Sequence, residues 1–312
     1  MLFFCSGQDL SLWREQAKQQ AIAASVSPTE VDWLLLEVTD LDSLSLRLDF
    51  KQRSHIFLKY SLDELTQLWS KRTSSRIPVQ YLIGQTHWRN YLLKVSESVL
   101  IPRPETELII DLARQATENS SSDLKKGIWV DLGTGSGAIA IGLADVLTNA
   151  QIYAVDISGA ALAIAQENIN RLGFTDRIKL LQGSWWTPLE AFKGQGLSPE
   201  SNSGACMPRQ ISGMIANPPY IPSKVIPTLE PEVAQHEPQI ALDGGQDGLD
   251  AIRYLVQTAP HYLHSGGVWL IEIMAGQGKE VIELLQQQGD YKNMQIICDL
   301  AGFDRFVRAE RR

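Results

Sequence analysis

The segment Val130-Asp131-Leu132-Gly133-Thr134-Gly135-Ser136-Gly137 decides the fold that this sequence predicts. It completes an apolar strand candidate at 128–131 and leads into an apolar helix candidate that begins at Ala138. Glycines at such a junction let the backbone turn sharply and lie against a ligand at the helix N-terminus. The D-x-G-x-G-x-G spacing differs from the G-x-G-x-x-G of dinucleotide sites, and no lysine follows as in a P-loop. A tight turn without a ligand is the alternative interpretation.

Strand and helix candidates alternate around this segment. The strand candidates lie at 128–131, 152–156, 178–182, 214–216, 268–273, 294–300 and 306–309. The helix candidates lie at about 105–118, 138–148, 159–172, 249–263 and 277–288. Such alternation predicts an α/β fold with a parallel sheet covered by helices on both faces. The connection at 301–305 is too short for a parallel crossover, so the final strand is expected to run antiparallel to its neighbour.

The N-terminal part predicts a different organisation. Two capping-box patterns, Ser27 to Glu30 and Ser61 to Glu64, each precede leucine-rich helical spacing. Alternating apolar residues from Pro78 to Leu100 surround turn signals and predict a β-hairpin. We therefore expect a helical domain at 1–76, a β-hairpin linker at 77–100 and an α/β domain at 101–312. Residues 193–213 are rich in glycine, serine and proline and predict a surface insertion.

Composition narrows the class of protein. Three cysteines, far apart in the sequence, argue against a disulfide framework and a cysteine-rich zinc site, and favour a reducing cytoplasm. The five histidines show no ligand spacing, so no metal is expected. No apolar run approaches the roughly 20 residues that span a membrane. The net charge of −8 makes direct binding of nucleic acid unexpected, because phosphate backbones usually meet a basic face.

A carboxylate after the second strand candidate of the α/β part supports the ligand interpretation. Asp156 ends that strand, and a carboxylate there can accept hydrogen bonds from both hydroxyls of an adenosine ribose. The alternative is an aspartate that caps the next helix, a task that Ser158 can perform instead. Trp185 follows the next strand candidate and can pack against adenine, although a core or loop tryptophan is a comparable interpretation on spacing alone.

The tetrapeptide Asn217-Pro218-Pro219-Tyr220 follows the strand candidate at 214–216 and indicates methylation of a planar nitrogen. A site for a planar NH₂ group must accept its two hydrogens in plane and direct the nitrogen at the methyl donor. The side-chain oxygen of Asn217 and the carbonyl oxygen of Pro218 can accept those hydrogens, and the two prolines stiffen the backbone. Tyr220 offers an aromatic face for stacking. Alone, the tetrapeptide is also typical of a loop.

With these motifs together, the chain resembles class I S-adenosylmethionine-dependent methyltransferases, and more narrowly the HemK-type release-factor glutamine methyltransferases. The narrower resemblance covers about residues 75–310 and is carried, in order, by segments 78–84, 101–107, 131–137, 155–158, 217–220 and 244–249. Its most specific part is Arg103-Pro104-Glu105-Thr106-Glu107. The resemblance implies a Rossmann-like seven-stranded sheet with a reversed last strand, preceded by a helical domain that helps to bind the substrate.

The resemblance also implies roles for individual residues. S-adenosylmethionine would be held by Gly133, Thr134, Gly135, Ser136, Gly137, Asp156, Trp185 and Asn217. Catalysis and substrate binding would fall to Asn217, Pro218, Pro219 and Tyr220, with Arg103 and Glu105 at the mouth of the site. The substrate would be the glutamine of the Gly-Gly-Gln loop of peptide chain release factors. For Glu105, a first-turn position in a helix that begins at Pro104 is a sufficient structural explanation.

Two positions depart from the family pattern, and other functions stay open. His87-Trp88-Arg89 replaces the usual Phe-Trp-Gly, and Met274 replaces a glycine. The main alternatives are methylation of an exocyclic amine of adenine or guanine in an unpaired base, and methylation of another protein glutamine. A cofactor-binding protein with a decayed site would require the loss of Asn217, Asp156 or a loop glycine, and all are present. A dehydrogenase is disfavoured by the glycine spacing.

Overall fold

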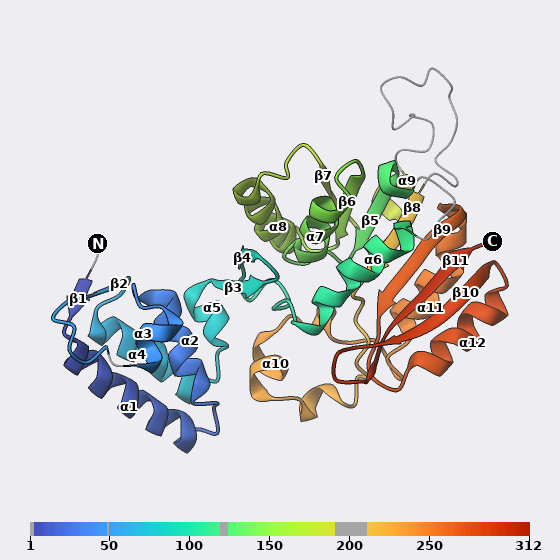
Figure 1. Cartoon of the computed structure of the whole chain (residues 1–312). Helices are drawn as coiled ribbons and strands as arrows, with labels where there is room; N and C mark the ends of the chain where they lie inside the picture. Colours follow the sequence, from blue (N-terminus) through green and yellow to red (C-terminus); the bar gives the residue numbers. More distant parts are fainter. Residues whose placement is uncertain (1–2, 49, 119–123, 191–210) are drawn as a thin grey trace. The chain divides into compact units, whose positions relative to one another are not determined.

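The computed structural model describes residues 3–48, 50–118, 124–190 and 211–312, and the chain forms two compact units, Met1–Gly84 and Gln85–Arg312 (Figure 1). In this described part, no helix combines the length and the apolar character that crossing a membrane requires. Of the predicted insertion at 193–213, residues 193–210 lie outside the described residues. Residues 211–213 belong to strand β8 (Ile211–Ala216), which is longer than predicted.

The first unit is mostly helical, as predicted. Its elements are β1 (Phe3–Cys5), α1 (Gly7–Ala23), α2 (Thr29–Val38), α3 (Ser43–Arg47), β2 (Ile56–Leu58), α4 (Leu62–Ser74) and α5 (Val79–Ile83). The helices enclose a core that includes Leu10, Leu35 and Trp69, all buried. Strands β1 and β2 pair antiparallel. The sequence does not predict this small sheet, because strands of three residues are too short to show an alternation.

The two capping-box predictions have opposite outcomes. Ser61 caps α4: the amide of Glu64 donates to Ser61 Oγ at 3.2 Å, and the amide of Ser61 donates to Glu64 Oε2 at 2.8 Å. The prediction at Ser27 is wrong, because α2 begins at Thr29 with no side-chain cap. The hydroxyl of Ser27 instead forms a hydrogen bond of 2.8 Å with the hydroxyl of Thr29.

The predicted hairpin at 77–100 is only partly correct. Residues Val79–Ile83 form helix α5, whose first turn closes when the amide of Leu82 donates to the carbonyl of Pro78. The helix ends at Gly84, which adopts φ +78°. The hairpin begins after this glycine, with β3 (Gln85–Trp88) and β4 (Tyr91–Lys94). Packing of Val79 in the core of the first unit accounts for the helix, despite the alternating apolar pattern.

The second unit contains a seven-stranded sheet with the order β10-β11-β9-β8-β5-β6-β7. Besides β8, its strands are β5 (Ile128–Leu132), β6 (Gln151–Asp156), β7 (Ile178–Gln182), β9 (Leu263–Glu272), β10 (Tyr291–Cys298) and β11 (Asp304–Arg311). Neighbouring strands from β7 to β9 pair parallel, whereas β11 pairs antiparallel with both β9 and β10. The predicted α/β class and the reversed last strand are confirmed.

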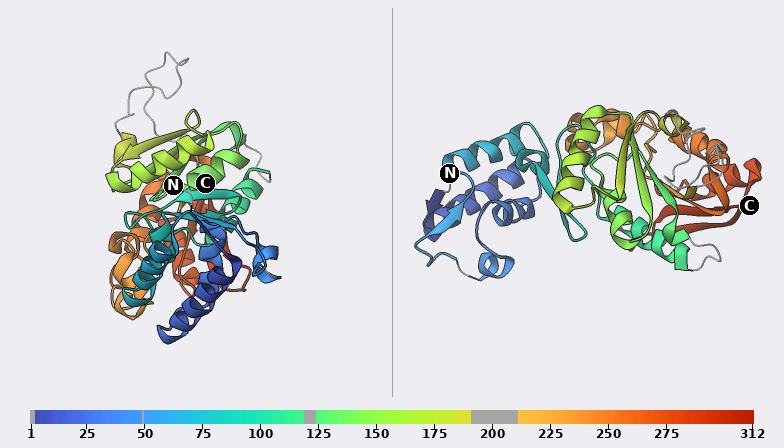
Figure 2. Two further views of the ribbon diagram at one scale, coloured as in Figure 1. Left: turned by 90° about the vertical axis from the view of Figure 1, so that its left-hand side faces the viewer. Right: turned by 90° about the horizontal axis from the view of Figure 1, so that it is seen from above.

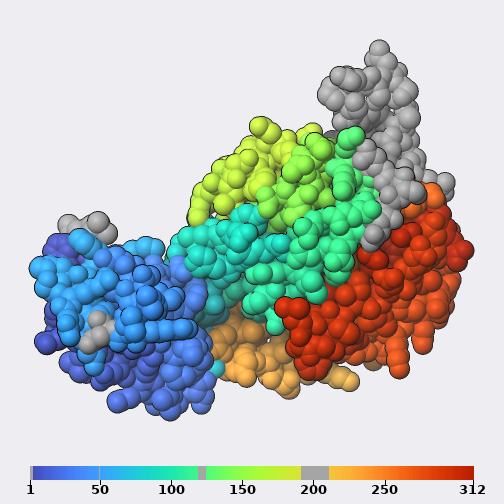
Figure 3. Space-filling model, viewed as in Figure 1, coloured from blue at the N-terminus to red at the C-terminus, as the bar shows by residue number. Residues whose placement is uncertain are grey.

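Helices cover both faces of this sheet (Figures 1 and 2). One face carries α6 (Leu108–Glu118), α7 (Ala138–Val146) and α8 (Gly159–Leu172), which pack around Trp129. The other face carries α9 (Thr187–Glu190), α11 (Asp250–Thr258) and α12 (Gly278–Gln288), which pack around Trp269. In the space-filling view of Figure 3, the green α6 region and the red C-terminal strands are both exposed on the face that is shown.

The strand order fixes where a ligand can bind. Strands β6 and β7 extend the sheet on one side of β5, and the chain then returns to place β8 on its other side. Ligands of open α/β sheets bind outside the carboxyl ends of the strands at such a switch point. The glycine segment follows β5 and Asn217 follows β8. The two motifs therefore lie at the same edge of the sheet. Short helices η3 (Ile226–Thr228), α10 (Pro231–His236) and η4 (Gln239–Ala241) follow β8.

Candidate active site

A pocket of about 770 Å³ lies at this edge of the sheet. Of the predicted site residues, its walls include Gly133, Thr134, Gly135, Ser136, Asp156, Trp185, Asn217 and Pro219. Five predicted residues do not line it: Arg103, Glu105, Gly137, Pro218 and Tyr220. The pocket thus unites the glycine segment with the start of the tetrapeptide, two motifs that are about 80 residues apart in the sequence.

The glycine segment is folded by bonds between backbone groups. The amides of Gly133 and Thr134 donate to the carbonyl of Val155 in β6 at 2.9 and 3.0 Å. Gly135 has φ +53°, and an added Cβ would meet no atom within 4 Å. Gly137 has a different task, because an added Cβ there would lie 3.3 Å from the Cβ of Ala165 in α8. Gly137 therefore permits close helix packing and stays outside the pocket.

Asp156 is held in place by two backbone amides. Its Oδ2 accepts from Gly135 and its Oδ1 from Ser158, both at 2.9 Å. The helix-capping interpretation does not apply, because Ser158 Oγ accepts from the amide of Ala161 and caps α8. Each carboxylate oxygen keeps further lone pairs for a ligand in the pocket. The geometry supports the predicted contact with ribose hydroxyls.

Asp131, the residue before the last one of β5, is buried behind the glycine segment, and the sequence analysis assigns it no role. Its carboxyl group is fully buried; Oδ2 accepts from Thr134 Oγ1 at 2.6 Å and from the amide of Ala140 at 3.1 Å. Oδ1 has no hydrogen-bond partner. Burial raises the pKa of Asp131 to about 7, opposing the effect of the two donors. This carboxyl group therefore carries a proton for part of the time near neutral pH.

Two aromatic side chains form one wall of the pocket. Trp185 follows β7 and adopts φ +49°, and its ring centroid lies 6.4 Å from that of Tyr254 in α11. Both residues line the pocket. Their arrangement offers flat apolar surface for an adenine ring. Nothing in the sequence near Tyr254 marks it as a site residue, because it belongs to an ordinary amphipathic helix.

The tetrapeptide presents only part of itself to the pocket. Asn217 and Pro219 line it, whereas Tyr220 directs its hydroxyl away to Glu272 Oε1 at 2.9 Å. The predicted stacking face of Tyr220 is therefore not a wall of this pocket. The side-chain nitrogen of Asn217 donates to Thr106 Oγ1 at 3.4 Å. Thr106 also lines the pocket, so the specific Arg103-to-Glu107 segment does reach the site, through its threonine.

The charged residues of that segment form contacts away from the pocket. Arg103 Nη2 lies 2.5 Å from Glu237 Oε2, and the side chain of Glu237 is buried. Burial raises the pKa of Glu237, and Arg103 opposes that rise. Glu105 and Glu107 belong to η1 (Glu105–Glu107), and Glu107 Oε1 accepts from the amide of Arg89 at 2.8 Å. Arg103 thus ties the segment to the region after α10.

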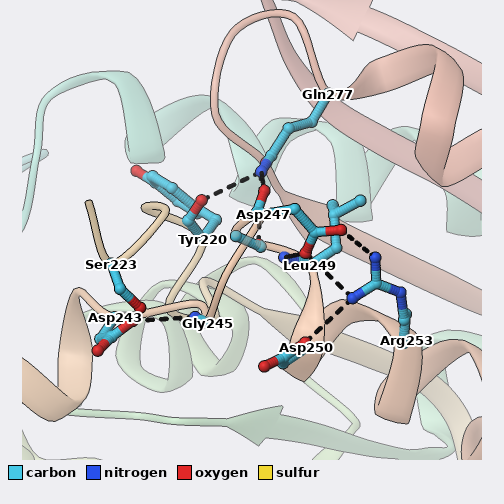
Figure 4. Close-up of polar contacts among 10 residues, drawn as sticks. Tyr220, Ser223, Asp243, Gly245, Asp247, Leu249, Asp250, Arg253 and Gln277 are labelled. Atoms are coloured by element: carbon cyan, nitrogen blue, oxygen red, sulfur yellow. Dashed lines mark hydrogen bonds and ion pairs between the residues drawn. The ribbon is translucent and has the colours of Figure 1, made fainter. Parts of the chain in front are cut away.

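A second layer of residues supports the backbone of the tetrapeptide (Figure 4). Gln277 Nε2 donates to the carbonyl of Tyr220 at 3.1 Å and to that of Gly248 at 3.4 Å. Gly248 has φ +83°, and an added Cβ would lie 2.3 Å from the carbonyl oxygen of Tyr220. Asp247 accepts from the amide of Leu249 and from Arg253, which keeps this turn in place. The glycine-rich segment 244–249 therefore fixes the backbone of the tetrapeptide. Gln277 was not predicted.

Metal ligands are not part of the described site. Within residues 3–48, 50–118, 124–190 and 211–312, no group of three or more His, Cys, Asp or Glu side chains could hold a metal ion. The charged residues that line the pocket are acidic: Glu97, Asp156, Asp243 and Asp250. An acidic lining suits a ligand that carries positive charge.

Comparison with known proteins gives the family. A model described as a methyltransferase domain matches residues 124–195. A release factor glutamine methyltransferase of Synechocystis sp. is 48% identical over 307 residues, 98% of this chain and 97% of that protein. One from Thermosynechococcus vestitus is 42% identical over 308 residues, 98% and 99% of the two chains. The hMettl16 catalytic domain, solved with a MAT2A 3′UTR hairpin, shares the fold, with a TM-score of 0.53 at 12% identity over 90% of this chain and 91% of that one.

These similarities confirm the resemblance noted in the sequence, together with the predicted methyltransferase fold and the S-adenosylmethionine cofactor. They extend through both compact units, since the alignments cover nearly the whole chain. The chain therefore belongs to the release factor glutamine methyltransferase family.

Proposed function

We propose that this chain transfers a methyl group from S-adenosylmethionine to the side-chain amide nitrogen of the glutamine in the Gly-Gly-Gln motif of peptide chain release factors. The observation that carries the proposal is the shared pocket of the glycine segment, Asp156 and Asn217. The glycine segment and Asp156 would hold the methyl donor, and Asn217 would hold the substrate amide beside it. Family membership supports release factors as the substrate class, and we propose the cytoplasm as the location.

The pocket residues fit the proposed cofactor. The backbone of the glycine segment and the carboxylate of Asp156 line the pocket, where a nucleoside needs close approach of the backbone and acceptors for its hydroxyl groups. Trp185 and Tyr254 offer flat surface for the base. We propose that Gly133, Thr134, Gly135, Ser136, Asp156, Trp185 and Asn217 hold the cofactor.

When bound, S-adenosylmethionine supplies an electrophilic methyl group on positively charged sulfur. The residues of this chain then have to orient the glutamine amide and exclude water. Asn217 Oδ1, at the pocket, would accept one hydrogen of the substrate NH₂ group. The carbonyl of Pro218, a residue outside the pocket lining, would accept the other, which holds the nitrogen in plane. Pro218 and Pro219 limit backbone motion and supply no competing N–H donor. The methyl group leaves the sulfonium as the nitrogen is methylated, and the nitrogen then loses one hydrogen as a proton to water at the mouth of the site, so positioning replaces a dedicated strong base.

Other predicted residues receive modified roles. Arg103 is engaged with Glu237, so we propose that it shapes the mouth of the site and does not bind the amide itself. Glu105 and Tyr220 lie outside the pocket lining, and we propose that any contact with the release factor occurs at the protein surface. For the helical first unit, expected at 1–76 and compact over Met1–Gly84, we propose recognition of the release factor.

The test is methyl transfer from labelled S-adenosylmethionine to a purified release factor. The matched samples are a Gly-Gly-Gln-to-Gly-Gly-Ala release factor, a nucleic-acid substrate and the Asn217→Ala enzyme. We expect label on the unmodified release factor alone. Label on the Gly-Gly-Ala factor would place the reaction on another residue, and label on nucleic acid alone would replace the proposed substrate. Absence of label on every substrate, with intact cofactor binding, would also contradict the proposal.

A further inference from the structure

Glu272, at the end of β9, is a buried carboxylate beside the pocket, and neither the sequence motifs nor the proposed chemistry uses it. It is 1% exposed and accepts two hydroxyl hydrogens, from Thr106 Oγ1 at 2.6 Å and from Tyr220 OH at 2.9 Å. Thr106 Oγ1 in turn accepts from the side-chain nitrogen of Asn217 at 3.4 Å. The result is a continuous chain of hydrogen bonds from Glu272 to the residue proposed to hold the substrate amide.

The chemical character of each group fixes the direction of every bond in this chain. A carboxylate can only accept hydrogen bonds, so the single hydroxyl hydrogen of Thr106 points to Glu272. Thr106 Oγ1 then offers only lone pairs toward Asn217. A carboxamide has a donor end and an acceptor end, which are nearly equal in shape and are distinguished by their partners. Only the NH₂ end of Asn217 can face Thr106, which turns Oδ1 away from it.

From this geometry we infer that Glu272 and Thr106 are positioning residues that set the orientation of the Asn217 carboxamide, so that its oxygen and not its NH₂ group faces the substrate. The inference rests on the proposed function, because it concerns how Asn217 accepts a hydrogen of the glutamine amide. Tyr220 shares the same carboxylate, so its hydroxyl bond holds the far end of the tetrapeptide. One buried group thus fixes both Asn217 and Tyr220.

The cost of burial also favours a role beyond packing. A buried carboxylate is expensive to desolvate, and apolar residues of similar volume often give equal or greater stability. Burial raises the pKa of Glu272, as does the nearby Glu105, whereas the two hydroxyl donors and Arg305 act in the opposite direction. Tyr220 remains protonated, because burial and the nearby Glu272 raise its pKa. It therefore keeps its hydrogen available for the carboxylate.

Two substitutions test the direction of the bonds. Thr106→Val retains the shape but removes the hydroxyl, and Glu272→Gln allows an NH₂ group to face Thr106. In the second variant Thr106 can turn its hydrogen to Asn217 Oδ1, which would reverse the carboxamide. We expect each variant to lower kcat by about 10- to 100-fold, typical of residues that orient a ligand-binding group. The KM for the release factor and the Kd for the cofactor should stay within about threefold.

The chain offers matched controls for both changes. Thr117→Val removes a buried threonine hydroxyl that donates to the carbonyl of Arg114 in α6, away from the pocket. Tyr262→Phe removes a tyrosine hydroxyl that donates to Glu190 at 3.0 Å. We expect both controls to retain wild-type kcat. Thr106→Ser, which keeps the hydroxyl, should restore most of the activity that Thr106→Val loses. Equal kcat values for Thr106→Val and Thr117→Val would overturn the inference.

A spectroscopic measurement separates this inference from the proposed function. In the full chain labelled with ¹⁵N-asparagine, the side-chain NH₂ signals of Asn217 are identified by their absence in Asn217→Ala. Thr106→Val and Glu272→Gln should shift these signals, whereas Tyr262→Phe should leave them in place. Unchanged signals in both network variants would contradict the inference even if the release factor is methylated. Shifted signals in a protein that does not methylate the factor would support the network and count against the substrate.

Discussion

The two loops that form the pocket are held in different ways. The glycine segment is fixed by the neighbouring strand β6: its amides donate to the carbonyl of Val155 and to the carboxylate of Asp156. The tetrapeptide loop is fixed by side chains from distant segments, since Thr106, Glu272 and Gln277 approach it from three different elements. The first loop depends on backbone conformation and the second on the assembly of the whole unit. Damage to the two loops should therefore have different consequences.

The largest expected effect separates chemistry from cofactor binding. Asn217→Ala removes the proposed acceptor for the substrate amide and should lower kcat by about 100- to 1,000-fold, as when one preorganised hydrogen-bonding group is lost from an active site. Cofactor affinity should change only a few-fold, because the glycine segment and Asp156 are intact. Single-turnover transfer and calorimetric titration of the cofactor measure the two quantities. Substantial turnover by the variant would refute the role of Asn217.

Asp156→Ala should produce the opposite pattern. The change removes the proposed acceptor for the ribose and the anchor for the amide of Gly135. Hydrogen bonds to charged groups contribute about 1.5–3 kcal/mol each, so the cofactor Kd should rise by about 10- to 100-fold. At saturating cofactor, kcat should recover toward the wild-type value. An unchanged Kd would remove Asp156 from the cofactor site.

A pair of glycine variants tests the support beneath the tetrapeptide. Gly248→Ala and Gly276→Ala both place a Cβ on a residue with positive φ, +83° and +96°. Only the Cβ at Gly248 would collide with the carbonyl of Tyr220, whereas the one at Gly276 meets nothing within 4 Å. We expect Gly248→Ala to lose about 1–3 kcal/mol more unfolding free energy and to lower kcat as well. Urea unfolding and steady-state kinetics compare the two; equal losses would argue against this support.

The smallest expected effect is a pH dependence of the unfolding free energy that arises from Asp131, which lies beside the glycine segment. The folded-state pKa of Asp131, about 7, lies above the roughly 3.9 of an unfolded chain, so the folded protein holds this proton more tightly. The protonated Asp131 contributes its full share of the unfolding free energy below about pH 4, and this contribution is lost as pH rises through 7. Between pH 6 and 7 the wild type should lose about 1 kcal/mol relative to Asp131→Asn. Urea unfolding of both proteins without cofactor measures this difference; parallel pH profiles would exclude it.

The same contrast explains how much could be predicted from the sequence. The strands, the reversed last strand and the glycine segment were predicted because each depends on local spacing. Asp156 was found because it ends a strand next to the glycine segment. Thr106 and Glu272 are 166 residues apart, and only the folded sheet brings them together. Likewise, Tyr254 and Gln277 carry no local signal, because their function comes from what surrounds them.

The wrong prediction of secondary structure at 79–83 has the same origin. Residues Val79–Ile83 show an alternating apolar pattern, yet they form helix α5, which packs Val79 in the core of the first unit. For the specific motif of Arg103 to Glu107, the substrate-binding roles of Arg103 and Glu105 stay predictions, and the described geometry places Thr106, the residue between Glu105 and Glu107, at the pocket. A motif identifies the segment that matters, whereas its individual roles depend on which side chains the fold directs inward.

Arg89 shows how a sequence can replace a missing glycine. It occupies the hairpin turn with φ +51°, a conformation that costs a non-glycine residue about 1–2 kcal/mol. In return its guanidinium donates to the carbonyl of Glu107 at 2.7 Å and to Asp111 at 3.1 Å, while its amide donates to the Glu107 side chain. A glycine at this position would form the turn without strain, but it has no side chain to bond to Glu107 and Asp111. The arginine therefore bonds the hairpin turn to the start of α6, and Thr106, one residue before Glu107, lies in the segment that these bonds hold.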